Sequence, residues 1–141
     1  MPSSEYSPLS GLPERDNGPE NWALGFCISN FLSGVRDGLY AAAFESLFIG
    51  KGFYSEDGWE LCRWPHRVLG ADVVSDYQDN GFLAWTDPDD YGYEPSWRVY
   101  EEVEFKRLMA GCVRRHLESV VGAKQYESQL VDALALYGCS M

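Results

Sequence analysis

Residues 105–121 have the sequence FKRLMAGCVRRHLESVV, which carries the clearest periodicity in the chain. Its apolar side chains recur at intervals of three or four positions, at Phe105, Leu108, Met109, Cys112, Val113, Leu117, Val120 and Val121. In an α-helix this spacing places them in one stripe. Gly122 follows directly, and glycine is favoured just beyond a helix C-terminus. The stretch therefore predicts an amphipathic helix that buries one face.

Three further segments have helical character. Almost every residue of 22–32 is apolar or small, which predicts a buried helix. The apolar residues of 40–48 and of 126–137 also follow helical spacing. Gly50 and Gly52 mark the end of the first of these two segments. The sequence thus predicts about four helices, two on each side of the middle of the chain.

The middle of the chain has the character of strands. Residues 59–64 (WELCRW) and 81–86 (GFLAWT) are short runs entered through polar turns that contain glycine. A third strand is predicted over 97–105, where apolar residues alternate at Trp97, Val99, Val103 and Phe105. Short polar turns favour antiparallel pairing. The predicted fold class is α+β, a small antiparallel sheet packed with about four helices.

Length and composition predict one globular domain. The chain has 141 residues, of which 45% are hydrophobic and 23% charged, enough to bury a core. Residues 1–21 hold four prolines and predict an irregular N-terminal arm, and residues 22–141 a single α+β domain. The chain has no apolar run of about 18 residues and does not begin with a basic then apolar signal. We therefore expect a soluble, cytoplasmic protein.

Charge is the strongest compositional signal. Twenty-two acidic and eleven basic residues give a net charge of −11. Such a field repels phosphate backbones and anionic membranes, so neither nucleic acid nor membrane is an expected partner. The 105–121 stretch carries four cations, which are expected to form ion pairs within the protein or to offset the negative charge of the sheet region: Lys106, Arg107, Arg114 and Arg115. A basic protein, in contrast, would be attracted.

The negative charge is concentrated in residues 72–104, which hold ten acidic residues and one basic residue, interleaved with aromatic residues. Carboxylates pair with Arg and Lys, and rigid rings supply contact area at a small entropic cost. The residues predicted to bind a partner are Asp76, Asp79, Trp85, Asp87, Asp89, Asp90, Tyr91, Tyr93 and Glu94. The alternative interpretation is a solvated acidic loop beside an aromatic core.

No motif for catalysis or metal binding is complete. Residues 87–92 (DPDDYG) match a calcium-binding loop in having Asp at positions 1 and 3 and Gly at position 6. Arg98, however, stands at position 12, where such a loop needs a Glu. The four cysteines form no C-x-x-C pair and are expected to be free, buried thiols. Cys62 and His66 lack an orienting third group. We expect no catalytic residue, no metal and no cofactor, and therefore no enzyme.

A resemblance to a known protein family covers roughly residues 80–121 and is strongest in residues 97–105 (WRVYEEVEF) and the helix that follows to residue 121. The strand, the Glu-Phe pair and the amphipathic helix with its basic pair are similar to those of immunity proteins of bacterial contact-dependent inhibition and related polymorphic toxin systems. The resemblance implies a protein that binds a cognate toxin, commonly a nuclease or another basic enzyme, and neutralises it by occluding its active site. It assigns no individual contact residue and no oligomeric state.

A second hypothesis concerns the tryptophans. Trp59, Trp64, Trp85 and Trp97 could line the pocket of a small-ligand-binding protein or an enzyme, because aromatic walls suit sugars and flat ligands. They suit a hydrophobic core equally well. An adaptor in an unrelated assembly is a third alternative, which the sequence does not separate from an immunity protein.

Overall fold

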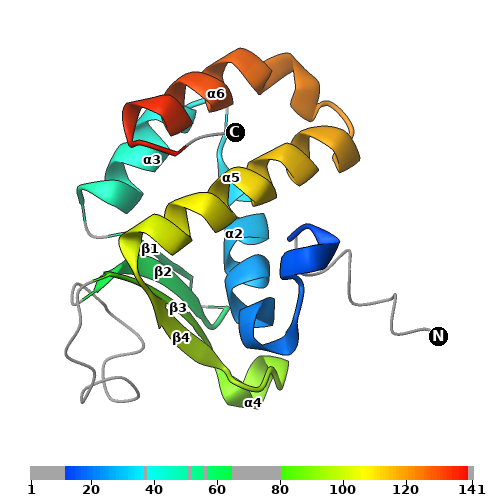
Figure 1. Cartoon of the computed structure of the whole chain (residues 1–141), viewed down its shortest axis with the longest axis vertical. Helices are drawn as coiled ribbons and strands as arrows, with labels where there is room; N and C mark the ends of the chain where they lie inside the picture. Colours follow the sequence, from blue (N-terminus) through cyan, green and yellow to red (C-terminus); the bar gives the residue numbers. More distant parts are fainter. Residues whose placement is uncertain (1–11, 37, 51, 56, 65–80, 140–141) are drawn as a thin grey trace.

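The computed structural model describes residues 12–36, 38–50, 52–55, 57–64 and 81–139, which form an α+β fold (Figure 1). The longer helices are α2 (Trp22–Gly34), α3 (Tyr40–Phe48), α5 (Glu102–Ser119) and α6 (Glu127–Leu136). A sheet of four strands is made by β1 (Phe53–Ser55), β2 (Trp59–Trp64), β3 (Gly81–Thr86) and β4 (Trp97–Tyr100). The predicted fold class is confirmed.

The sheet is antiparallel throughout, with its strands in chain order. Glu60 of β2 lies opposite Trp85 of β3, which lies opposite Trp97 of β4. Gly81 begins β3 at a point where the backbones of β3 and β4 approach closely, since a Cβ there would lie 2.0 Å from the carbonyl oxygen of Tyr100. Only glycine fits this position without moving the backbone of β4.

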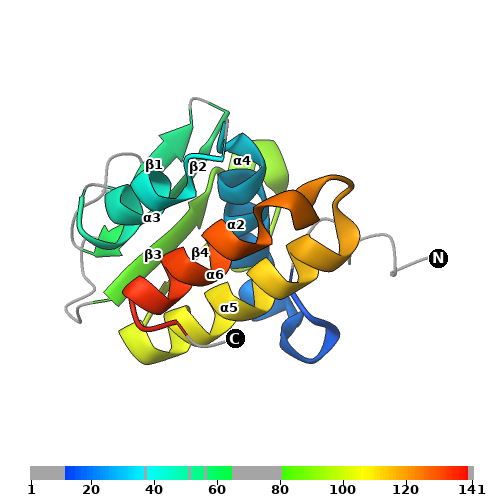
Figure 2. The same cartoon turned by 90° about the horizontal axis from the view of Figure 1, so that it is seen from above.

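Helices α2 and α5 pack on one face of the sheet (Figures 1 and 2). The core between them includes Ile28 of α2, Phe82 of β3 and Phe105 of α5. The rings of Phe82 and Phe105 stack with centroids 4.1 Å apart. Side chains on the opposite face of the sheet form a second, smaller buried cluster, which consists of Cys62, Trp64, Leu83, Trp85 and Val99.

Helices α3 and α6 pack against each other beyond the sheet (Figure 1). The ring of Phe48, at the end of α3, stacks on that of Tyr137 with centroids 5.0 Å apart. Phe48 also makes edge contacts with Phe82 and Phe105. This aromatic group joins the α3–α6 pair to the core over the sheet.

The third predicted strand is too long, which is a correction. Strand β4 ends at Tyr100, and α5 already begins at Glu102, so Val103 and Phe105 are helical. Val103 is 81% exposed, whereas Phe105 is buried. Glu102 and Glu104 favour a helix start because carboxylates in the first turn interact well with the helix dipole.

Two short elements and one glycine also differ from the sequence-based expectation. Strand β1 and the four-residue helix α4 (Pro88–Tyr91) were not predicted. Helix α5 ends at Ser119, and Gly122, with φ of 85°, turns the chain into the 3-10 helix η4 (Ala123–Tyr126). Gly122 therefore serves the turn between α5 and α6.

The described part of the N-terminal segment packs on the domain. Leu12 is buried in the main core, and two 3-10 turns follow, η2 (Glu14–Asp16) and η3 (Pro19–Asn21). The Asn21 side chain accepts hydrogen bonds from Arg98, at 2.8 Å, and from the Tyr100 hydroxyl, at 2.7 Å. Residues 12–21 are thus tied to β4.

Candidate functional site

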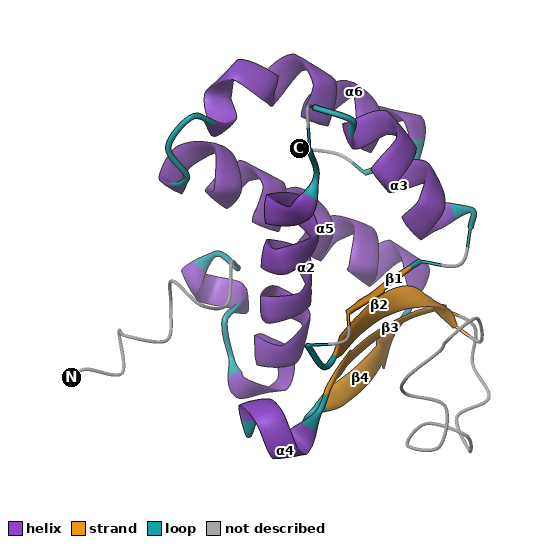
Figure 3. Cartoon of the chain, turned by 180° about the vertical axis from the view of Figure 1, so that it is seen from behind, coloured by secondary structure: helices purple, strands orange, loops and turns teal. Residues whose placement is uncertain are grey.

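Helix α4 projects at one end of the sheet, beside the start of α2 (Figure 3). Asp87 is its N-cap, and its Oδ1 accepts a hydrogen bond of 2.9 Å from the Asp89 backbone N–H. Pro88 occupies the first helical position, where proline is favoured. Gly92 ends the helix with a left-handed φ of 69°. The sequence DPDDYG therefore encodes a capped helical turn.

Two tyrosines fix this turn to the body of the protein. The rings of Tyr91 and Tyr93 pack on Phe26 of α2, with centroid distances of 4.5 and 5.6 Å. The Tyr91 hydroxyl donates a 2.5 Å hydrogen bond to the carbonyl oxygen of Asp57, in the turn between β1 and β2. Both tyrosines are half-buried, so they pack on the body of the protein and remain partly accessible to solvent.

The β1–β2 turn adds a carboxylate to this region. The Asp87 N–H donates a 2.8 Å hydrogen bond to the carbonyl of Gly58, which holds Asp57 beside α4. We call Asp57, Asp87, Asp89, Asp90 and Glu94, together with Tyr91 and Tyr93, the acidic end. None of its five carboxylates forms an ion pair with a residue that the structure describes. Its negative charge is therefore not neutralised within the described part of the chain.

The surroundings of Tyr91 disfavour ionisation of its hydroxyl. Burial raises the pKa of Tyr91, and the nearby carboxylates of Asp57 and Asp90 raise it further. The hydroxyl, which is neutral at pH 7 in any tyrosine, thus stays a hydrogen-bond donor to the Asp57 carbonyl into more alkaline solution. Asp89, Asp90 and Glu94 are exposed to solvent.

The structure brings most of the predicted contact residues together. Asp87, Asp89, Asp90, Tyr91, Tyr93 and Glu94 all belong to the acidic end. Trp85 does not, because alternation along β3 turns its side chain into the cluster with Leu83, where it is 7% exposed. This corrects its assignment as a surface contact. Asp76 and Asp79 lie outside the described residues.

The four tryptophans do not line one pocket, which corrects that form of the second hypothesis. Trp59 belongs to the core on the helix side of the sheet. Trp64 and Trp85 are buried in the cluster on the opposite face, and Trp97 packs against it. The alternation of side chains along strands separates the two sets.

The sequence interpretation missed a buried carboxylate. Glu60, the second residue of β2, is 1% exposed, and its carboxylate accepts a hydrogen bond of 3.5 Å from the Cys62 Sγ. On the neighbouring strand, the Trp85 Nε1 is buried without a hydrogen-bond partner in the described part of the chain. The sequence does indicate a buried carboxylate here, because Glu60 is the one acidic residue among the apolar residues at the start of WELCRW.

The cations of α5 divide into two pairs. Lys106 pairs with Glu102 at 2.6 Å and Arg107 with Asp16 at 3.1 Å, which confirms the expected internal pairing for these two. Arg114 and Arg115 form no ion pair with a described residue. They provide a basic pair away from the acidic end that can serve as a control surface.

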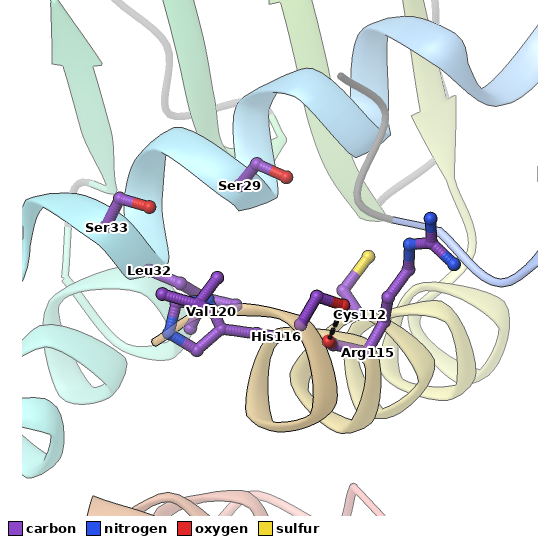
Figure 4. Close-up of a pocket in the computed structure, with 8 residues that line it drawn as sticks. Ser29, Leu32, Ser33, Cys112, Arg115, His116 and Val120 are labelled. Carbon is purple, nitrogen blue, oxygen red and sulfur yellow. Dashed lines mark hydrogen bonds between the residues drawn. The ribbon is translucent and has the colours of Figure 1, made fainter. Parts of the chain in front are cut away.

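A cavity of about 430 Å³ lies between α2 and α5 (Figure 4). Ser29 and Ser33 face it from α2, and Cys112, Arg115 and His116 from α5. Burial raises the pKa of the Cys112 thiol and lowers the pKa of His116, so both groups are neutral at pH 7. No hydrogen bond joins His116 to a serine or to Cys112 among the described residues. Among the described residues, the cavity thus shows no hydrogen-bonded pair of nucleophile and base, the arrangement that activates a nucleophile.

The described ranges contain neither a cluster of metal-ligating side chains nor a helix that could cross a membrane. No group of three or more His, Cys, Asp or Glu side chains in them is placed to hold a metal ion. All four cysteines are free and buried, as expected. None of the helices in these ranges has the length and apolar character needed to cross a bilayer.

Comparison of the chain with protein-family models, with curated proteins and with solved structures finds no match.

Proposed function

We propose that this protein is an immunity protein that binds a basic toxin domain and neutralises it by covering its active site with the acidic end. The observation that carries the proposal is the set of five carboxylates, unpaired among the described residues, on a turn that is capped and packed in place. A partner that acts on nucleic acid has a positive cleft, to which such a surface is complementary.

The charge of the acidic end favours rapid association. At physiological salt the screening length is about 8 Å, so carboxylates within one helical turn and its flanks act together on an approaching cation. Electrostatic steering of this kind raises association rates by factors of about 10 to 10³. The net charge of −11 reinforces the attraction at longer range.

The rigidity of the acidic end favours tight binding. The Asp87 cap and the Tyr91 hydrogen bond already hold the turn that carries Asp89 and Asp90. Less conformational entropy is then lost when the complex forms. The half-exposed rings of Tyr91 and Tyr93 can contact the partner without leaving their packing on Phe26.

The experiment begins with the full chain, tagged at the C-terminus and purified from its host in low and high salt, with mass spectrometry of bound proteins. The expected partner is basic, stoichiometric and released by salt. Expressed alone it should arrest growth, and co-expression of the wild-type chain should restore growth.

Two charge-reversal variants test the surface. Asp89→Lys/Asp90→Lys should lose growth protection, whereas Arg114→Glu/Arg115→Glu on α5 should keep it. Circular dichroism establishes that both variants fold. Protection by a folded Asp89→Lys/Asp90→Lys chain, equal to that of the wild type, would remove the acidic end from the mechanism.

A further inference from the structure

A second cavity, of about 400 Å³, lies between α2, α3 and β1. Its apolar lining includes the buried rings of Phe31 and Trp59. The ring of Phe53 meets that of Phe31 edge-on, with centroids 4.8 Å apart. At the mouth, Leu39 is 61% and Tyr54 56% exposed, unusually high for large apolar and aromatic side chains beside a cavity.

The polar groups of this cavity are few and stand beside the apolar lining. They come from Asn30, Arg36 and Ser46. The Asn30 side chain is held by a 2.8 Å hydrogen bond from its amide to the Phe26 carbonyl. Arg36 is exposed, and none of the described residues forms an ion pair with its guanidinium group. An aromatic cavity of this size with one or two orienting polar groups is typical of small-molecule sites.

We propose that this cavity binds a small planar apolar molecule that carries one carboxylate. The ring system lies against Trp59, Phe53 and Leu39, and the carboxylate pairs with Arg36. Burial of the ring supplies most of the affinity, because it removes apolar surface from water. The pair with Arg36 is solvent-exposed and contributes orientation and a small preference for the anion.

The cavity shares no lining residue with the acidic end, although the β1–β2 hairpin contributes to both, with Asp57 in its turn and Tyr54 and Trp59 beside the cavity. The two proposals therefore rest on different side chains and are tested by different variants. Failure of one proposal therefore leaves the other intact.

The test uses 2-naphthoate, with 2-naphthalenemethanol as the uncharged molecule of similar shape, titrated into the ¹⁵N-labelled full chain and followed by amide chemical shifts. We expect saturable shifts at amides of α3 and β1, and binding of 2-naphthoate about two- to five-fold tighter than that of the alcohol. Arg36→Gln should remove that preference. Arg114→Gln, which changes the same charge on α5, should keep it.

A matched pair of variants on α3 locates the ligand. Ala42 and Ala41 are neighbours and both are exposed, but only Ala42 lines the cavity. Ala42→Phe should weaken binding of both probes by at least ten-fold, and Ala41→Phe should leave it unchanged. The absence of saturable shifts, or equal binding by Ala42→Phe and the wild type, overturns the site. An undiminished preference for 2-naphthoate in Arg36→Gln overturns the assignment of the carboxylate.

Discussion

The N-cap of α4 allows the rigidity of the acidic end to be tested separately from its charge. Asp87→Ala removes both one carboxylate and the hydrogen bond to the Asp89 N–H. Asp87→Asn removes the same charge but keeps a side-chain oxygen that caps equally well. Any difference between the two variants therefore measures the cap.

The size of that difference follows from the structure. Loss of a capping side chain costs about 1 kcal/mol, and α4 has only four residues, so no other hydrogen-bonded turn compensates. For a domain of this size the expected fall in Tm is about 3–4 °C for Asp87→Ala relative to Asp87→Asn. Hydrogen exchange at the amides of Asp90 and Tyr91 should also be faster in Asp87→Ala, because both N–H groups bond to the Asp87 carbonyl within the same turn.

Thermal denaturation followed by circular dichroism, together with hydrogen exchange, provides the assay. If Asp87→Ala and Asp87→Asn have the same Tm and the same exchange rates, the cap does not stabilise α4 and the reasoning is refuted. If they differ as expected, Asp87→Ala should also bind the partner more weakly than Asp87→Asn.

Two further predictions concern the core and the interhelical cavity. Gly81→Ala should destabilise the fold by about 1–3 kcal/mol in urea unfolding, because the new methyl group meets the Tyr100 carbonyl oxygen. Gly34→Ala, where a Cβ meets nothing within 4 Å, is the control and should stabilise the fold by up to about 1 kcal/mol. Equal effects of the two would show that the close approach at β3 is tolerated. Burial lowers the pKa of His116 below 6.5, so the unfolded chain takes up the proton first and stability falls as the pH drops from 6.5 toward the lowered pKa. His116→Gln should lose this part of the pH dependence in urea unfolding at pH 7.5, 6.5 and 5.5, and an unchanged profile would show that His116 does not contribute to it.

Much of the fold could be predicted because its elements have simple periods. The apolar stripe of α5 runs from Phe105 to Leu117, although Val120 and Val121, which were predicted to extend it, lie beyond the helix and are exposed. Strands β2 and β3 are short, largely apolar segments entered through turns. The start of α5 was predicted less well, because Val99, Val103 and Phe105 lie on alternate positions and so fit a strand, although Val103 is exposed and Phe105 alone belongs to the helical stripe. Strand β1 has three residues, too few for any period to show.

The acidic end was found in part, because its carboxylates are close in sequence. Asp57 was missed, since it comes beside α4 only through tertiary hydrogen bonds, from the Tyr91 hydroxyl to its own carbonyl and from the Asp87 N–H to the Gly58 carbonyl. Trp85 was misassigned because its position beside acidic residues suggested exposure. The apolar character of β3 on both faces was the better signal, as it is typical of a strand buried on both sides.

The association rate constant of the captured partner with the wild-type chain and with Asp89→Lys/Asp90→Lys, at low and at physiological salt, tests the central claim most directly. Reversal of two carboxylates changes the charge of the acidic end by four units, so the rate should fall at least about ten-fold at low salt and less at physiological salt. Arg114→Glu/Arg115→Glu should not slow association. Equal rates for the wild type and a folded Asp89→Lys/Asp90→Lys chain at both salt concentrations would contradict the claim that the acidic end binds the partner.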